Sequence, residues 1–221
     1  MIKKKFSFVC VVPARAGSKS IKNKNLIRVN SKSLVNNTLD FASSAQIFDK
    51  IILSSDSDKI LDLGSNYKNL IKHKRSKKNS KDQSTTEEVI LEINNDLKLK
   101  SDYVFILEPT SYFREKSTFK KIINLINKNK PASIVSITSN KSINIDIQHN
   151  QIKTNINAVP RRRQDRDKNY MLASNFWVVR LSYFKIYKNI ISKKPYFIEI
   201  SKKESIDINN NFDLKLVKSF F

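Results

Sequence analysis

Several residue types are scarce in this sequence. Among its 221 residues there are one cysteine, Cys10, two glycines and one tryptophan. A lone cysteine excludes an intrachain disulfide scaffold and a cysteine-rich zinc site. No apolar run approaches the roughly 20 residues that cross a bilayer, so we expect no membrane segment. The N-terminus is basic and then apolar, but Pro13 follows at once, and we interpret it as a lysine-rich lead into a first strand. These absences favour a cytoplasmic globular protein.

Acidic residues are scarce too. The chain has 42 Lys plus Arg against 20 Asp plus Glu, a formal net charge of +22. Such a charge is typical of proteins that bind nucleic acid or acidic lipid. Lys, Asn and Ile are abundant everywhere, loops included, which instead favours a biased composition, and no nucleic-acid-binding module is recognisable. We favour solvated faces plus one anionic-ligand site, with no specific nucleic-acid or membrane partner. A basic nucleic-acid-binding protein stays open as an alternative.

Short apolar runs alternate with longer amphipathic ones along the chain. This alternation predicts one α/β domain over residues 1–221, whose mostly parallel sheet is covered by helices on both faces. Ligands of such sheets bind at the carboxyl ends of the strands. The runs place strands at 6–12, 50–54, 103–107, 133–138, 175–181 and 197–200, and helices at 33–45, 57–67, 84–97, 116–129 and 210–221.

The stretch at about 139–170 breaks this rhythm. It is polar, carries isoleucine at alternate positions, and contains four of the arginines between positions 161 and 166. We expect a short hairpin or arm that projects from the sheet.

The loop after the first predicted strand is the most informative segment. Gly17 lies just past the strand, and Arg15, Ser18, Lys19 and Lys24 surround it. A glycine there lets the backbone approach a ligand, and the charges suit a polyphosphate. The spacing matches neither a P-loop nor a dinucleotide fingerprint. Taken alone, the loop is also compatible with a solvated turn.

The same segment, Val12 to Asn25, resembles the signature of the CMP-sialic acid synthetase family, which includes legionaminic and pseudaminic acid cytidylyltransferases. That signature reads P-A-R-x-G-S-K-x-x-x-x-K-N, and every fixed position is matched from Pro13 to Asn25. Further family motifs are matched in order along nearly the whole chain, at 52–56, 82–86, 107–114, 162–165 and 204–209.

The resemblance implies a three-layer α/β/α, Rossmann-like nucleotidyltransferase fold and a reaction of CTP with an acidic nonulosonic sugar, which yields a CMP-sugar and pyrophosphate. It implies catalytic roles for Arg15, Lys24 and Asp207. The nucleotide-binding residues it implies are Ala14, Arg15, Gly17, Ser18, Lys24, Asn25, Arg75, Ser84 and Thr85. The lysine-rich surroundings of Arg75 favour a solvated loop there. Ser84 and Thr85 are equally compatible with a plain helix N-cap.

A divalent cation, Mg²⁺, is implied at Asp207 and Asn209. The second position is an aspartate in the family, so Asn209 brings a ligand oxygen without a charge. The alternative for Asp207 is a cap for the last helix.

The sugar side is implied to involve Glu108, Thr110 and Ser111, together with Arg163, Gln164 and Tyr170 on the arm. In the family the arm reaches a neighbouring subunit, so we expect a homodimer, and an arginine fork matches the sugar's carboxylate. Three departures cluster here: Glu108 for Gln, Tyr112 for Pro, and Ala173-Ser174 for Asn-Gly. They predict a CTP-using transferase with an unusual sugar. A Kdo-type enzyme and a catalytically weakened paralogue stay open. We assign His73 and His149 no catalytic role, and we expect Trp177 in the core.

Overall fold

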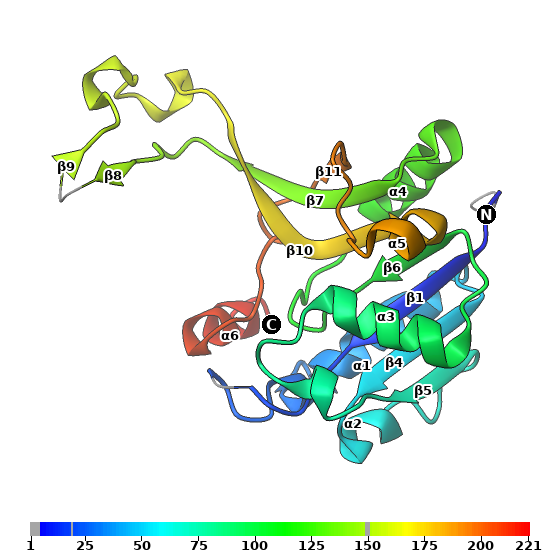
Figure 1. The fold of residues 1–221 in the computed structure, drawn as a ribbon. Helices are drawn as coiled ribbons and strands as arrows, with labels where there is room; N and C mark the ends of the chain where they lie inside the picture. Colours follow the sequence, from blue (N-terminus) through cyan, green and yellow to red (C-terminus); the bar gives the residue numbers. More distant parts are fainter. Residues whose placement is uncertain (1–4, 19, 149–150) are drawn as a thin grey trace.

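A seven-stranded sheet forms the centre of the protein, which we describe from a computed structural model over residues 5–18, 20–148 and 151–221 (Figure 1). The strand order is β11-β7-β10-β6-β1-β4-β5, and β10 alone runs antiparallel to its neighbours. The mostly parallel sheet predicted from the sequence is therefore confirmed. The strands are β1 (Phe8–Pro13), β4 (Lys50–Ser55), β5 (Leu70–Lys74), β6 (Tyr103–Ile106), β7 (Ser133–Asn140), β10 (Asn169–Arg180) and β11 (Tyr196–Glu199).

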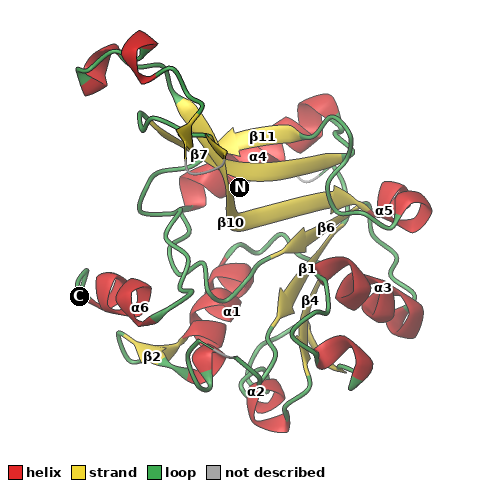
Figure 2. Ribbon diagram, turned by 60° about the vertical axis from the view of Figure 1, so that its left-hand side comes forward, coloured by secondary structure: helices red, strands yellow, loops and turns green. Residues whose placement is uncertain are grey.

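Helices cover both faces of the sheet (Figure 2). Side chains along β1 alternate between the two faces, as a strand buried on both sides requires. Phe8, Cys10 and Val12 pack with one set of helices, while Val9 and Val11 pack with the other. The first set is α1 (Leu34–Ser44), α2 (Asp58–Asp62) and α4 (Lys116–Asn129), and the second is α3 (Thr86–Leu97) and α5 (Leu181–Tyr187). These layers are the predicted α/β/α arrangement.

Cys10 lies inside this core. Its side chain is fully buried in β1. Burial raises the pKa of the Cys10 thiol well above its usual value, against a smaller lowering by the nearby Arg114. A buried thiol that stays protonated is chemically inert, so Cys10 is a packing residue.

The segment before the last helix, α6 (Asn211–Lys218), is fastened to the end of β6. The Glu204 carboxylate is buried and accepts hydrogen bonds from the Glu115 N–H and the Thr118 hydroxyl, both at 3.0 Å. Asp207 forms a backbone bridge with Ser111, and the Ile208 N–H donates to the Thr110 carbonyl at 3.0 Å. These contacts bring residues 204–209 to the carboxyl end of the central strands.

Some elements differ from the sequence prediction. Strand β5 was not predicted, because its lysines mask its alternating pattern, and α5 was not predicted either. The predicted helix 57–67 ends at Asp62, and turns around Gly64 follow. A Cβ at Gly64 would lie 2.7 Å from the Leu70 side chain, so the chain packs tightly there. The remaining short elements are β2 (Arg28–Val29), β3 (Lys32–Ser33), β8 (Ile147–Gln148), β9 (Gln151–Ile152), η1 (Lys24–Leu26), η2 (Lys78–Ser80), η3 (Ile156–Ala158) and η4 (Arg163–Asp165).

The chain between β7 and β10 extends away from the sheet as an arm (Figure 1). It carries the β8–β9 pair and two short 3-10 helices. Apolar side chains are exposed on it, as at Ile147, and on the adjoining start of β10, as at Tyr170 and Leu172. Within the described ranges, none of the helices has the length and apolar character that a bilayer crossing requires.

Candidate active site

The loop after β1 is held in a defined shape by three hydrogen bonds. The Ala14 N–H donates to the Ser54 carbonyl at 2.9 Å, and the Ala16 N–H donates to Asp56 Oδ1 at 2.8 Å. The Asn25 side-chain amide donates to the Arg15 carbonyl, also at 2.8 Å. Ala14 itself is fully buried and does not line the cleft, so it contributes through its backbone. Lys19 lies outside the described residues.

Gly17 does not occupy a backbone conformation that only glycine adopts easily. Its φ is not in the left-handed region, and a Cβ there would meet nothing closer than Arg15 Nη1 at 3.7 Å. The protein's own backbone therefore does not require glycine. What the missing side chain leaves is room in the cleft for a ligand.

One cleft gathers most of the predicted nucleotide-binding residues at the carboxyl ends of the strands. It is lined by Pro13, Arg15, Gly17, Ser18, Lys24, Asn25, Arg75, Ser84, Thr85, Thr86, Val89, Glu108, Pro109 and Thr110. Arg15 is ion-paired with Asp82, a partner that no sequence pattern indicated. Burial lowers the pKa of Lys24, opposed chiefly by the nearby Asp207 carboxylate.

Arg75 corrects one expectation. It is only 7% exposed, so the solvated loop favoured by its lysine-rich surroundings is wrong. Its N–H bonds to the Ser55 carbonyl at 2.8 Å, and its guanidinium bonds to the Ser54 hydroxyl and carbonyl at 3.3 and 3.0 Å. Burial lowers the pKa of Arg75, while Asp56 and Glu92 raise it. The structure thus places a buried cation at the cleft.

Of the two residues Ser84 and Thr85, Thr85 is the helix N-cap, and both lie at the cleft. Thr85 is the N-cap of α3 and forms a capping box with Glu88. The Ser84 hydroxyl donates to the Lys78 carbonyl at 3.1 Å. Both residues also line the cleft, so the start of α3, with its free N–H groups, faces the same space as Arg15.

Asp207 is not a helix cap. The cap of α6 is Asn210, whose side chain accepts from the Phe212 and Asp213 N–H groups. Asp207 Oδ2 accepts from the Asn209 amide at 3.0 Å, and Oδ1 is buried with no hydrogen bond from the described residues. The Lys24 ammonium donates to the Asn209 carbonyl at 3.4 Å. The catalytic candidates Lys24 and Asp207 are therefore neighbours, although 183 positions separate them in the sequence.

Glu108 lies half-buried in the cleft at the end of β6. Burial first, and the Asp207 carboxylate second, raise its pKa from the usual 4.5 to about 7, against a lowering by Arg114. Arg114 donates to the Glu108 backbone carbonyl at 2.5 Å.

The raised pKa of Glu108 predicts a pH-dependent effect of Glu108→Gln. The Glu108 carboxyl binds its proton more tightly in the folded state than in the unfolded state. Its favourable contribution to the free energy of unfolding is therefore complete below about pH 4.5 and is lost as the pH rises through about 7. Above that range the folded protein carries a desolvated charge that glutamine lacks. We expect the variant to melt at a higher temperature than wild type near pH 8, and the difference to shrink near pH 5.5.

The measurement is thermal unfolding without Mg²⁺ or CTP. Glu199→Gln is the matched control, because that carboxylate lies on the surface at the end of β11. A Glu108→Gln difference that is the same at both pH values would contradict the assignment.

The residues at the other two departures on the predicted sugar side are not among those that line the cleft. Tyr112 is buried, and its hydroxyl donates to the Val29 carbonyl at 3.3 Å. Ala173 is buried in β10, beside the bulge that precedes Trp177, which is half-buried against the second core cluster. Of the three departures, Glu108 alone faces the ligand space.

The remaining sugar-side candidates are divided between two places. Thr110 lines the cleft, whereas Ser111 is 1% exposed and holds Asp207 through its backbone. Arg163, Gln164 and Tyr170 are exposed on the arm and are not among the described residues that line this cleft.

Comparison with known protein families decides the class of the protein. A family model described as cytidylyltransferase matches residues 9–205. The chain belongs to the cytidylyltransferase family. This confirms the predicted enzyme class, a nucleotidyltransferase, and the family resemblance drawn from the motifs.

Curated cytidylyltransferases align with most of the chain. The CMP-N,N'-diacetyllegionaminic acid synthase of Legionella pneumophila is 26% identical over 225 residues, covering 95% of this chain and 94% of that protein. A pseudaminic acid cytidylyltransferase of Helicobacter pylori, fused to a hydrolase, is 28% identical and covers 90% of this chain and 40% of its own length. The N-acylneuraminate cytidylyltransferase of Streptococcus agalactiae is 22% identical, with 93% and 51% covered. The chain spans about half or less of these last two relatives.

Solved structures show the same fold. The 4-diphosphocytidyl-2C-methyl-D-erythritol synthase of Anaerococcus prevotii superimposes with a TM-score of 0.70 at 19% identity and 97% coverage of both chains. A CMP:2-keto-3-deoxy-manno-octonic acid synthetase, solved with CTP, has a TM-score of 0.70 at 12% identity, with 97% and 98% covered. The predicted nucleotidyltransferase-type Rossmann-like fold is confirmed.

Proposed function

We propose that this cytidylyltransferase activates an acidic nonulosonic sugar: the anomeric hydroxyl attacks the α-phosphate of CTP, a CMP-sugar forms and pyrophosphate leaves. The observation that carries the proposal is the meeting of Arg15 and Lys24 at one cleft, with the Asp207 carboxylate close to Lys24, in a chain of this family. The curated relatives named above act on legionaminic, pseudaminic and N-acylneuraminic acids, which are all acidic sugars of this class.

The phosphate side of the cleft is assigned to the loop after β1. Arg15 and Lys24 would pair with the triphosphate oxygens, and the Gly17 and Ser18 backbone would approach them closely. Asn25, bonded to the Arg15 carbonyl, would hold the loop and orient the nucleotide. Arg75, Ser84 and Thr85 would contact the nucleotide from the β5 end and the start of α3.

Mg²⁺ is the proposed cofactor, and the residues present fit it. Asp207 Oδ1 is a buried carboxylate oxygen that accepts no hydrogen bond from the residues described, and the Asn209 amide donates to the other oxygen of this carboxylate. Hard cations of this kind prefer such oxygen ligands together with substrate phosphates. When bound, the ion would neutralise phosphate charge that Lys24 and Arg15 alone leave uncompensated.

An Asn209→Asp variant tests the metal assignment. The substitution adds a second carboxylate beside Asp207, so we expect half-maximal activity at a several-fold lower Mg²⁺ concentration. Without metal the two carboxylates repel each other, and the variant should melt slightly lower than wild type. The measurement is a Mg²⁺ titration of turnover, with exposed Asn129→Asp on α4 as the control. An unchanged Mg²⁺ requirement would place Asn209 outside the metal site.

The arm is assigned to a homodimer. Figure 1 shows the chain between β7 and β10 projecting from the sheet. Arg163 and Gln164 lie on this arm and are exposed, as is Tyr170 at the start of β10. Exposed apolar side chains on the arm are those of Ile145, Ile147 and Ile152. We propose that the arm packs on a second copy of the chain, and that its arginine meets the carboxylate of the sugar bound there. The protein would act in the cytoplasm.

The deciding experiment is pyrophosphate release from CTP with Mg²⁺ and a panel of sialic, legionaminic and pseudaminic acids and Kdo. Release with one nine-carbon acid and CTP, but not with ATP, supports the proposal and names the sugar. Release with Kdo alone would replace it with the eight-carbon alternative. Silence throughout, with CTP still raising the melting temperature, would indicate a weakened paralogue. Silence without CTP stabilisation, together with salt-sensitive binding to nucleic acid, would favour the basic-protein alternative.

A further inference from the structure

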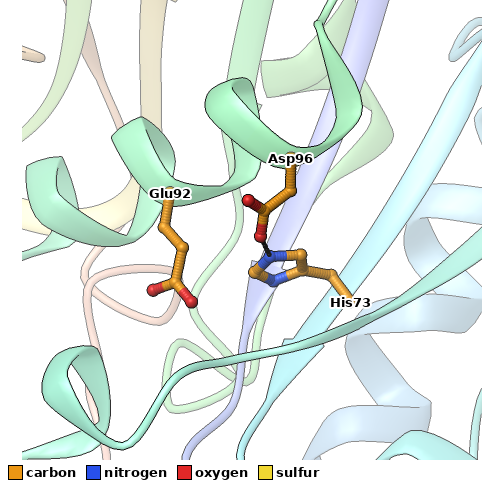
Figure 3. Close-up of side chains that lie close together, drawn as sticks. All are labelled: His73, Glu92 and Asp96. Atoms are coloured by element: carbon orange, nitrogen blue, oxygen red, sulfur yellow. Dashed lines mark hydrogen bonds and ion pairs between the residues drawn. The ribbon is translucent and has the colours of Figure 1, made fainter.

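His73 lies under the cleft on the edge strand β5 and is linked to two other elements. It is only 4% exposed, and Ser54 of β4 is its register partner in the sheet. His73 Nδ1 lies 3.0 Å from the Ser54 hydroxyl, and Nε2 lies 3.1 Å from Asp96 Oδ2 on α3. Figure 3 shows the Asp96 carboxylate directly over the imidazole. Both partners lie on elements that are distant from His73 in the sequence.

These contacts continue from Ser54 to Arg75 as a series of hydrogen bonds. Arg75 only donates, and its Nε–H bonds to the Ser54 hydroxyl oxygen at 3.3 Å. With the imidazole hydrogen assigned to Nε2, the Ser54 hydroxyl donates to His73 Nδ1 and the Nε2–H donates to Asp96. Four groups are then linked by hydrogen bonds: the Arg75 guanidinium at the cleft, the Ser54 hydroxyl, the His73 imidazole and the exposed Asp96 carboxylate. Bonds arranged in this way strengthen one another.

These hydrogen bonds hold the Arg75 guanidinium in one orientation. Its Nη2 also bonds to the Ser54 carbonyl at 3.0 Å, so a single residue, Ser54, holds the guanidinium at two points. The other guanidinium N–H groups have no protein partner in the part of the chain that the structure describes, and Arg75 lines the cleft. They are available to an acceptor on a ligand.

A metal ion is the competing explanation for the cluster. The ligand atoms of His73, Glu92 and Asp96 all lie within 4.8 Å of one another. Glu92, however, already accepts hydrogen bonds from the Ser76 N–H at 2.6 Å, from the Ser76 hydroxyl at 3.2 Å and from Asn79. Figure 3 shows its carboxylate beside the imidazole, with an interaction drawn to the ring from Asp96 but not from Glu92. The nearby Arg75 charge, which Glu92 offsets, further opposes a second cation.

We propose that His73 is a positioning residue for nucleotide binding: supported by Asp96, it orients Ser54 and thereby fixes the Arg75 guanidinium in the cleft. This inference rests on the proposed function in one respect, that CTP is the ligand of the cleft. The inference assigns a role to His73 and Asp96, neither of which is among the residues that line the cleft.

The test measures the CTP dissociation constant by calorimetry with Mg²⁺ in matched variants. His73→Phe fills the space but leaves Ser54 without an acceptor, and it should weaken CTP binding about tenfold. His73→Asn keeps an acceptor at the position of Nδ1 and should bind CTP nearly as wild type does. Asp96→Ala should weaken binding by a smaller factor. Asp62→Ala, which removes an exposed carboxylate from the neighbouring α2, is the control and should have no effect.

A double-mutant cycle separates positioning from a general loss of structure. In an Arg75→Ala background, His73→Phe should have no additional effect on CTP binding, because the group that it orients is gone. An equal weakening in both backgrounds, or an Asn variant as weak as the Phe variant, would overturn the inference. If the protein binds Zn²⁺ and Asp96→Ala abolishes that binding, the inference is also overturned. A metal on Nε2 would leave the imidazole hydrogen on Nδ1, and this would reverse the hydrogen bond between His73 and Ser54. If wild type itself does not bind CTP, the proposed function fails instead.

Discussion

An Arg15→Ala variant is expected to lose turnover by about 10²–10³-fold, the usual effect of deleting one charged donor from a site that stabilises developing charge. Arg15 is the arginine at the end of β1 in the loop that faces the cleft. Its side chain is 33% exposed and paired with the equally exposed Asp82, so the ion pair contributes little to folding. The variant should therefore keep its melting temperature while pyrophosphate release falls.

The control for Arg15→Ala is Arg28→Ala, which removes an exposed arginine from β2 outside the cleft. It should leave turnover unchanged, so a general loss of positive charge is tested separately. Arg15→Lys should fall between wild type and Arg15→Ala, because lysine keeps the charge but loses the forked donors. Near-normal turnover of Arg15→Ala would remove this residue from the phosphate site.

An Asp207→Asn variant is expected to lose turnover by about 10²-fold or more at low Mg²⁺, and to regain part of it when Mg²⁺ is raised. Asp207 is the sole carboxylate of the proposed pair, because its companion is Asn209. Asparagine has the same shape and preserves the backbone bridge to Ser111. The change thus removes charge and little else.

The measurement for Asp207→Asn is turnover across a Mg²⁺ titration, with the melting temperature of each variant recorded alongside. Asp62→Asn, at an exposed carboxylate on α2, serves as the control and should titrate as wild type does. A curve for Asp207→Asn that coincides with wild type would show that the metal binds elsewhere.

The residues that the sequence could predict are those whose arrangement is local. One loop carries five of them, and all five line the cleft: Arg15, Gly17, Ser18, Lys24 and Asn25. The layers could be predicted as well, because apolar periodicity reports burial directly.

What could not be predicted depends on pairing between distant elements. Arg75 is buried because β5 pairs with β4. The sequence of β5 is rich in lysine, and from local sequence alone it cannot be distinguished from a loop. The environment of Glu108 likewise follows from the return of residues 204–209 to β6. Charge composition gave the wrong expectation for Arg75 because it averages over neighbours in sequence and not in space.

The position of Cys10 has a practical consequence for studying the arm. The single thiol of the chain, Cys10, is buried in β1 and stays protonated, so thiol-labelling reagents should not react with it in the folded protein. An Ile147→Cys substitution on the arm, at a side chain 65% exposed, would give the reagent a single target without removal of the native residue. A spin label or dye attached there would report directly how far apart the arms of two associated copies lie in solution.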